Sequence, residues 1–162
     1  MLRLSASVCI DAPPEQVWAD LARLEAIELW SEPVLSARCA PGRDRGVGAV
    51  RVCRLRGGLE LIERWVSWDE GRSFTYEGTG IPLVASARNT WTVLSIGTQT
   101  MLTSEATVTV KGGRMGRLLE PLLGWQSRRL GRHALAAFKH LVETGSAPTV
   151  SHRRLAHPLP VC

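Results

Sequence analysis

The chain has 162 residues and a formal net charge of +5, carried by 18 arginines and two lysines against 15 acidic residues. A chain of this length can bury roughly 70% of its unfolded surface, which predicts one domain with a sizeable core. No run approaches the roughly 18 to 20 apolar residues of a membrane span, and the opening residues lack the apolar segment of a signal peptide. We therefore expect no integral membrane segment and a cytoplasmic protein.

The polar residues exclude several other classes of site. No basic run is interleaved with aromatic residues, so no nucleic-acid partner is predicted. The four cysteines show no CxxC spacing, and His133 and His140 have no third ligand near them in sequence, which argues against a metal site. Phosphate-binding and dinucleotide-binding fingerprints are missing from the sequence, so no cofactor is predicted either.

The first thirty residues predict a strand followed by two short helices. Residues 2–10 alternate apolar and polar side chains, which is the pattern of a strand with one buried face. The sequence from Asp11 to Glu15 offers a capping acid and two prolines, and apolar residues then recur at helical spacing, which predicts a helix over Pro14 to Leu21. A second short helical piece is expected from Leu24 to Trp30, ending before Pro33.

Six more strands are predicted between residues 34 and 110, because apolar and β-branched stretches alternate with turns rich in glycine. The turns are short, so the strands are expected to pair as antiparallel hairpins. The predicted strands are Val34 to Ala40, Val47 to Leu55, Leu59 to Trp68, Ser73 to Thr79, Ala85 to Leu94 and Thr100 to Val110.

One long helix is predicted from Met115 to Thr144, since its apolar residues return at steps of three and four and Gly145 is a natural C-terminal stop. A helix of this length must bury its apolar face under something broad. We therefore expect an α+β fold in which a curved seven-stranded antiparallel sheet wraps around the helix and leaves a cavity open at one end. Residues 1–144 form this domain, and 145–162 are expected to be a flexible basic tail.

The sequence also resembles a known superfamily. The carrying motifs are the opening VCIDAPPEQVWADL with Trp30 after it, the Gly46-Val-Gly48 turn, the hairpin from Glu63 to Arg72, the strand NTWTV, and LLEPLLG leading into a helix that ends in FKHLVETG. These are similar to the START-like, or birch-pollen-allergen-like, superfamily (SRPBCC) with its helix-grip fold, and most of all to its polyketide cyclase/dehydrase and lipid-transport branch. The resemblance covers roughly residues 2 to 144.

The resemblance implies a hydrophobic pocket between sheet and long helix, which relatives use for lipids, sterols, plant hormones or polyketides. Some members only carry ligands, and others close and dehydrate a poly-β-ketone chain. These cyclases share no catalytic triad, so no catalytic position transfers by motif. A hydrophobic small molecule is the partner it implies, and we expect a monomer or a homodimer.

Glu63 is one candidate catalytic residue. In the strand from Leu59 to Trp68 neither face is cleanly polar, so either Glu63 or Arg64 must point inward unless a β-bulge shifts the register. An inward carboxylate could act as a general acid or base in enol chemistry. The alternative is a structural salt bridge with Arg51 or Arg88.

Tyr76, the only tyrosine, is the second candidate, because a buried phenol needs a hydrogen-bond partner; it could equally lie at the rim of the sheet. We expect Trp91 to line the pocket beside Asn89, whose amide could orient a carbonyl oxygen, although Trp91 as plain core is the alternative. Further pocket residues are predicted along the same strands and the helix: Trp30, Arg51, Trp65, Arg88, Leu119, Leu122 and Leu123.

Three functions compete at this point. The first is a binding protein that holds a lipid, isoprenoid or polyketide-like molecule without chemistry. The second is a polyketide aromatase/cyclase or dehydratase with Glu63 or Tyr76 in acid/base duty. The third is a protein-interaction module that uses the outer face of the sheet or the basic tail.

Overall fold

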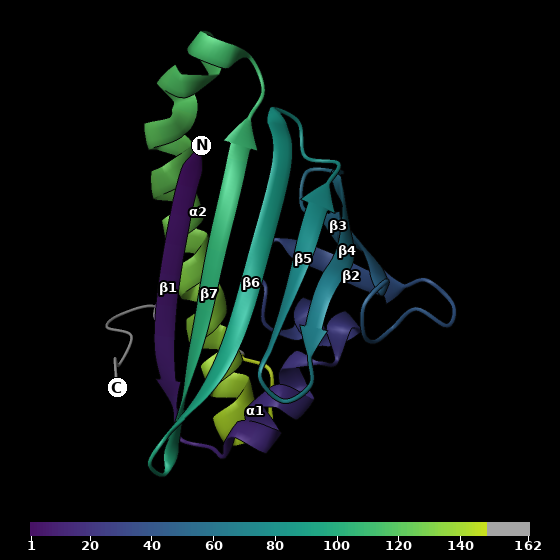
Figure 1. The fold of residues 1–162 in the computed structure, drawn as a ribbon, viewed down its shortest axis with the longest axis vertical. Coiled ribbons are helices and arrows are strands. Elements are labelled where there is room, and N and C mark those ends of the chain that lie inside the picture. Colours follow the sequence, from purple (N-terminus) through teal and green to yellow (C-terminus); the bar gives the residue numbers. More distant parts are fainter. Residues whose placement is uncertain (149–162) are drawn as a thin grey trace.

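The computed structural model describes residues 1–148, and of residues 113–123 it describes the backbone alone. Most of the predicted tail, from 149 onward, lies outside the described residues, as do the side chains of Leu119, Leu122 and Leu123. The predicted element order is confirmed, with α1 and a 3-10 turn, η1, after the first strand (Figure 1). The elements are β1 (Leu2–Ile10), α1 (Pro14–Leu21), η1 (Leu24–Leu29), β2 (Val34–Cys39), β3 (Val50–Leu55), β4 (Glu60–Asp69), β5 (Ser73–Thr79), β6 (Val84–Ile96), β7 (Gln99–Val110) and α2 (Gly113–Thr144).

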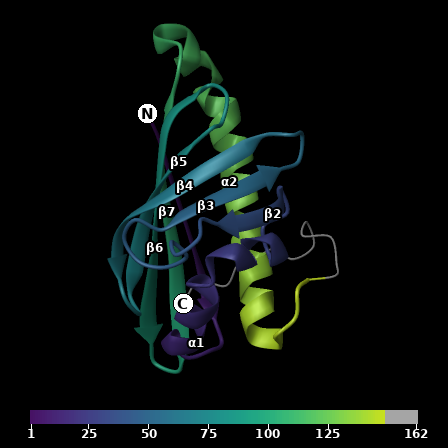
Figure 2. The ribbon, with the colours of Figure 1, turned by 90° about the vertical axis from the view of Figure 1, so that its right-hand side faces the viewer.

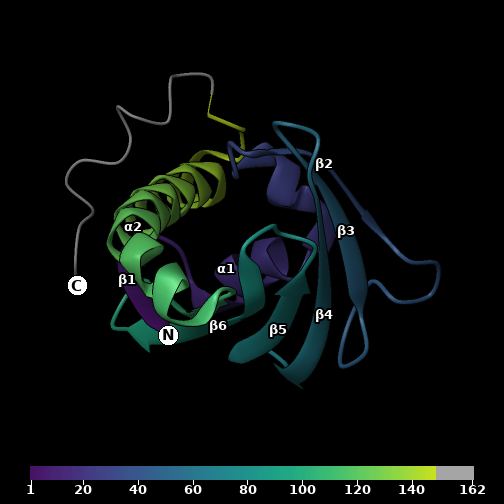
Figure 3. The same ribbon diagram turned by 90° about the horizontal axis from the view of Figure 1, so that it is seen from above.

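Within residues 1–148, seven strands form one antiparallel sheet in the order β1-β7-β6-β5-β4-β3-β2, and β1 and β7 are the only non-sequential neighbours there. Viewed from above in Figure 3, the sheet bends round with α1 and α2 on its concave side. Figure 2 shows β2, β3 and β4 crossing α2 obliquely. This is the predicted helix-grip arrangement.

One predicted strand begins later than its sequence suggested. Residues from Val47 were expected in a strand, yet β3 starts at Val50, because Gly46 and Gly48 have φ angles of 77° and 86°. These left-handed angles suit glycine and interrupt an extended strand. The segment is a turn instead, and Gly48 N donates to the Trp65 carbonyl 2.9 Å away, which fastens the turn to β4.

A β-bulge in β4 decides which side chains reach the interior. The pairing with β5 shifts register between Trp65 and Ser67. Before the bulge, Glu63 and Trp65 point to the concave side; after it, Trp68 does so too and stacks on Phe74 with ring centroids 5.3 Å apart. The alternation therefore breaks at the point where the interior gains an additional large ring.

The core is densely packed around the second half of α2. Val8, Trp91 and Leu102 of the sheet pack with Phe138 and Val142 of the helix, all of them buried. Trp30, after η1, closes this core, with its ring 5.2 Å from Phe138 and 5.8 Å from Trp91. The middle of α2, between Ser127 and Ala134, lies over a different part of the sheet, and there the interior is hollow.

Among the described residues, no helix is both long enough and apolar enough to cross a membrane. The same residues contain no group of three or more histidine, cysteine, aspartate or glutamate side chains placed to hold a metal ion.

Candidate functional site

A cavity of about 430 Å³ lies between the sheet and the middle of α2, where residues between Ser127 and Ala134 line it. Its volume falls within the roughly 300 to 1,000 Å³ typical of small-molecule sites. Strands β1, β4, β5, β6 and β7, the segment after η1 and one face of α2 all contribute to the wall. The floor consists of the buried rings of Trp30 and Trp91, and the half-buried Ile81, Val84 and Val108 lie toward the opposite end.

Small residues keep this space open. Gly131 of α2 lines the cavity, and a Cβ atom added there would meet no atom within 4 Å. A glycine inside a helix destabilises it by about 1 kcal/mol relative to alanine, and no packing contact at this position offsets that loss. Gly78 of β5 and Ala87 and Ala106 of the neighbouring strands also line the wall. The hollow is therefore a consequence of the side chains present on facing elements.

Glu63 enters the wall from β4 as one half of a buried ion pair. It is 2% exposed, and its partner Arg51, opposite in the β3–β4 register, is 4% exposed. Arg51 Nε and Nη2 lie 2.7 Å and 2.6 Å from Glu63 Oε2, and the Cys53 thiol donates to the same oxygen at 3.5 Å. Arg51 Nη1 donates to the carbonyl of Leu24, which ties the pair to η1.

The structure contains one of the interactions considered for Glu63. The salt bridge with Arg51 is present, and Arg88 is not its partner. Burial lowers the Arg51 pKa and the Glu63 carboxylate raises it, with a net pKa above the ordinary value, as expected of a guanidinium held in an ion pair. Burial raises the pKa of Cys53 to about 12, so this thiol is a neutral donor.

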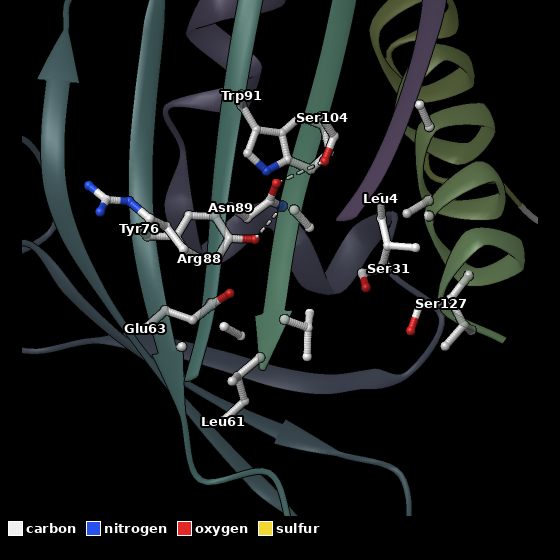
Figure 4. A pocket seen from close by; sticks show the side chains of 18 of the residues that line it. Leu4, Ser31, Leu61, Glu63, Tyr76, Arg88, Asn89, Trp91, Ser104 and Ser127 are labelled. Carbon is white, nitrogen blue, oxygen red and sulfur yellow. Dashed lines mark hydrogen bonds between the residues drawn. The ribbon is translucent and has the colours of Figure 1, made fainter. Parts of the chain in front are cut away.

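All three side-chain contacts of the Glu63 carboxylate end on Oε2. Within the described residues no protein donor reaches Oε1, although Glu63 lines the cavity. Figure 4 shows the carboxylate directed into the hollow, toward the region of the Tyr76 hydroxyl. The cavity wall therefore contains a fixed hydrogen-bond acceptor.

A second polar group comes from β5, β6 and β7. Asn89 Nδ2 donates to the Tyr76 hydroxyl oxygen at 3.1 Å, and Ser104 Oγ donates to Asn89 Oδ1 at 3.1 Å (Figure 4). Burial raises the pKa of Tyr76, the negative charge of Glu63 raises it further, and hydrogen bonding by Asn89 and Trp91 acts in the opposite direction. The net pKa lies above its ordinary value, so Tyr76 keeps its proton near neutral pH and can donate it.

The other predicted pocket residues fall into three groups. Trp30, Asn89 and Trp91 line the cavity, whereas Arg51 and Trp65 lie behind Glu63 and do not. Arg51 stacks over the Trp65 ring at 5.0 Å, and Trp65 Nε1 is the one buried side-chain nitrogen or oxygen without a partner in the described structure. Arg88 is on the wall, but Figure 4 shows its guanidinium directed away from the hollow, and it pairs with Glu77 at 3.7 Å.

Sequence reasoning missed Ser104, Gly78 and Gly131. Ser104 shares strand parity with Leu102 and Ala106, so its inward direction was available from alternation. The glycines carry no such signal, because an empty position is visible only when the facing elements are known.

The family model described as "Polyketide cyclase / dehydrase and lipid transport" matches residues 1–143. The chain belongs to this family. No curated protein sequence matches it.

Solved structures show the same fold. A protein from Thermus thermophilus has a TM-score of 0.75 and 20% identity, over 90% of this chain and 99% of its own. The Ara h 8.0201 structure has a TM-score of 0.70 and 13% identity, over 87% and 97%. The Zhui aromatase/cyclase from Streptomyces sp. R1128 has a TM-score of 0.65 and 16% identity, over 91% and 99%. At these identities the likeness concerns the fold alone.

Membership of the polyketide cyclase/dehydrase and lipid transport family agrees with the recognition made from the sequence motifs. It supports a role in hydrophobic-ligand binding or cyclisation.

Proposed function

We propose that this protein binds a hydrophobic small molecule, such as a lipid, an isoprenoid or a polyketide-like compound, in the cavity between the sheet and α2. The observation that carries the proposal is the hollow of about 430 Å³, walled mainly by apolar side chains with a few inward polar groups. Burying apolar ligand surface there would contribute roughly 25 cal/mol per Å². Trp91 and Trp30 offer ring faces at the floor, and Tyr76 and Glu63 offer a donor and an acceptor on the side.

Catalysis is the second candidate, favoured by the family and by Tyr76, a protonated donor inside the cavity. The case for Glu63 as an acid or base is weaker, because its carboxylate already balances the buried Arg51. Asn89 already uses one amide N–H on Tyr76 and its oxygen on Ser104, so only its second N–H is left for a ligand. We therefore place ligand binding ahead of cyclase or dehydrase activity.

A neutral fluorescent probe tests the binding proposal. N-phenylnaphthylamine brightens when it enters an apolar site, and we expect saturable binding at one site per chain. Gly131→Trp places an indole in the open space beside the helix and should abolish the signal. Gly131→Ala is the matched control, since a methyl group changes the same backbone position and leaves most of the volume free.

Native mass spectrometry of freshly purified protein complements this titration by detecting a co-purified molecule. Unchanged probe binding in folded Gly131→Trp would contradict a site in this cavity. A third function, as a protein-interaction module through the sheet exterior or the tail, would then be the better explanation.

A further inference from the structure

The polar groups of the cavity wall form two ends of an interrupted hydrogen-bond chain. On one side Ser104 donates to Asn89, and Asn89 donates to Tyr76. On the other side Glu63 Oε1 has no donor from the described protein, while Oε2 is occupied by Arg51 and Cys53. In Figure 4 the Tyr76 hydroxyl and the Glu63 carboxylate point into the same part of the hollow.

The Glu63 carboxylate determines which groups donate and which accept in this series of hydrogen bonds. Because Arg51 holds Glu63 as the anionic half of an ion pair, Oε1 can only accept. The negative charge also attracts the phenolic proton of Tyr76, as its upward effect on the Tyr76 pKa indicates. The Tyr76 oxygen is then left to accept from Asn89, which is the arrangement found.

We infer that the gap is filled by a ligand hydroxyl group, which accepts from Tyr76 and donates to Glu63 Oε1. A hydroxyl can do both at once, whereas a ketone or an ether oxygen can only accept and would cover the Glu63 Oε1 atom without donating to it. The ligand is therefore a neutral, mainly apolar alcohol, phenol or enol. This inference rests on the proposed function and narrows it.

Ser104 and Asn89 act in this scheme as positioning residues, because their hydrogen bonds run to each other and to Tyr76 and not to the ligand hydroxyl. Arg51 is likewise a positioning residue, because it contacts Glu63. The hydroxyl preference thus depends on five side chains from five strands, and two of them, Ser104 and Asn89, can be changed without touching the ion pair.

The test compares naphthol with its methyl ether by isothermal titration calorimetry. Both have the same rings and both accept a hydrogen bond, but only naphthol donates one. A hydrogen bond to a charged group is worth enough to change affinity by roughly ten- to a hundredfold, so we expect naphthol to bind that much more tightly than the ether.

Variants distinguish the loss of the hydroxyl contact from a general loss of fold stability. Arg51→Met combined with Glu63→Leu removes both charges, avoids a lone buried ion, and should bring the two affinities to within about threefold. Asn89→Asp gives Tyr76 an acceptor for its own proton, so Tyr76 ceases to donate to the ligand and naphthol should lose roughly three- to tenfold in affinity. Ser95→Ala, which removes an exposed hydroxyl of β6 away from the cavity wall, should leave the preference unchanged.

The outcomes are distinct. Equal binding of naphthol and ether by the wild type, or a preference that survives in the double variant, overturns the hydroxyl inference while leaving a hydrophobic site in place. Failure of naphthol, ether and N-phenylnaphthylamine to bind at all would instead overturn the proposed function.

Discussion

Breaking the Arg51–Glu63 pair is the most informative single perturbation of the fold. Both side chains are at least 95% buried, and the guanidinium makes two contacts of 2.6 to 2.7 Å with one carboxylate oxygen. Glu63→Gln leaves the Arg51 charge buried without its counter-ion. The loss of one partner from such a pair costs about 3 to 5 kcal/mol. The free energy of unfolding of a domain is usually only about 5 to 15 kcal/mol, so this variant would lose a large part of it.

The same loss can be expressed as a melting temperature. For a domain of this size, 1 kcal/mol corresponds to roughly 2 to 4 °C, so we expect Glu63→Gln to melt about 6 to 20 °C below the wild type. Arg51→Met with Glu63→Leu should recover most of this loss, because replacing a whole buried pair by apolar residues is often neutral or stabilising. Urea denaturation followed by tryptophan fluorescence gives the free energies of unfolding.

An exposed pair provides the control. Arg54 and Glu60 lie 3.6 Å apart on the same two strands with side chains 74% and 57% exposed, and Arg54→Met should cost no more than about 1 kcal/mol. If Glu63→Gln cost no more than Arg54→Met, or if the double variant were as unstable as the single one, the description of a buried, mutually dependent pair would be refuted.

Three further predictions concern the cavity and the titrating groups. Gly131→Ala should raise the free energy of unfolding by up to about 1 kcal/mol in urea denaturation, since it gains helix propensity in open space; a loss would mean that the position is not vacant. Tyr76, the sole tyrosine, should show its phenolate absorbance with a midpoint above the ordinary value near pH 10. Because its folded pKa is raised, its contribution to stability is complete below pH 10 and is lost as the pH rises beyond that value. A midpoint at or below pH 10 in the folded protein would contradict the burial of Tyr76. Glu70 accepts hydrogen bonds from Trp68 and Trp18 at 2.7 Å and from Arg45, and these bonds lower its pKa. Its contribution to stability should therefore be present above its unfolded pKa and fade as the pH falls through the folded pKa. A titration of the carboxyl NMR shift with an ordinary midpoint would disprove these bonds.

The topology was predictable because apolar and polar residues alternate along the strands and glycine marks the turns between consecutive strands. The period-two pattern of residues 2–10 and the helical spacing after residue 115 define the two ends of the fold, and short turns leave little choice between them. Boundaries moved by a few residues where backbone angles intervened, as at Gly46 and Gly48.

The site was only partly predictable, because alternation divides a strand into two faces without saying which is inside. Glu63 shows this: its strand has large apolar residues on both faces, and the bulge after Trp65 moves Trp68 to the concave side. The two readings of Glu63, acid/base group or salt-bridge partner, depended on the register with Arg51, which no local pattern contains. The cavity itself depends on Gly131 and Gly78, whose contribution is the absence of a side chain.

Anomalous diffraction from crystals soaked in bromonaphthol tests most directly whether a ligand lies between the sheet and α2. We predict a bromine peak inside the hollow bounded by Trp91, Gly131 and Val108, with the naphthol oxygen between Tyr76 and Glu63. An empty cavity with bromine peaks only on the outer face of the sheet would contradict it.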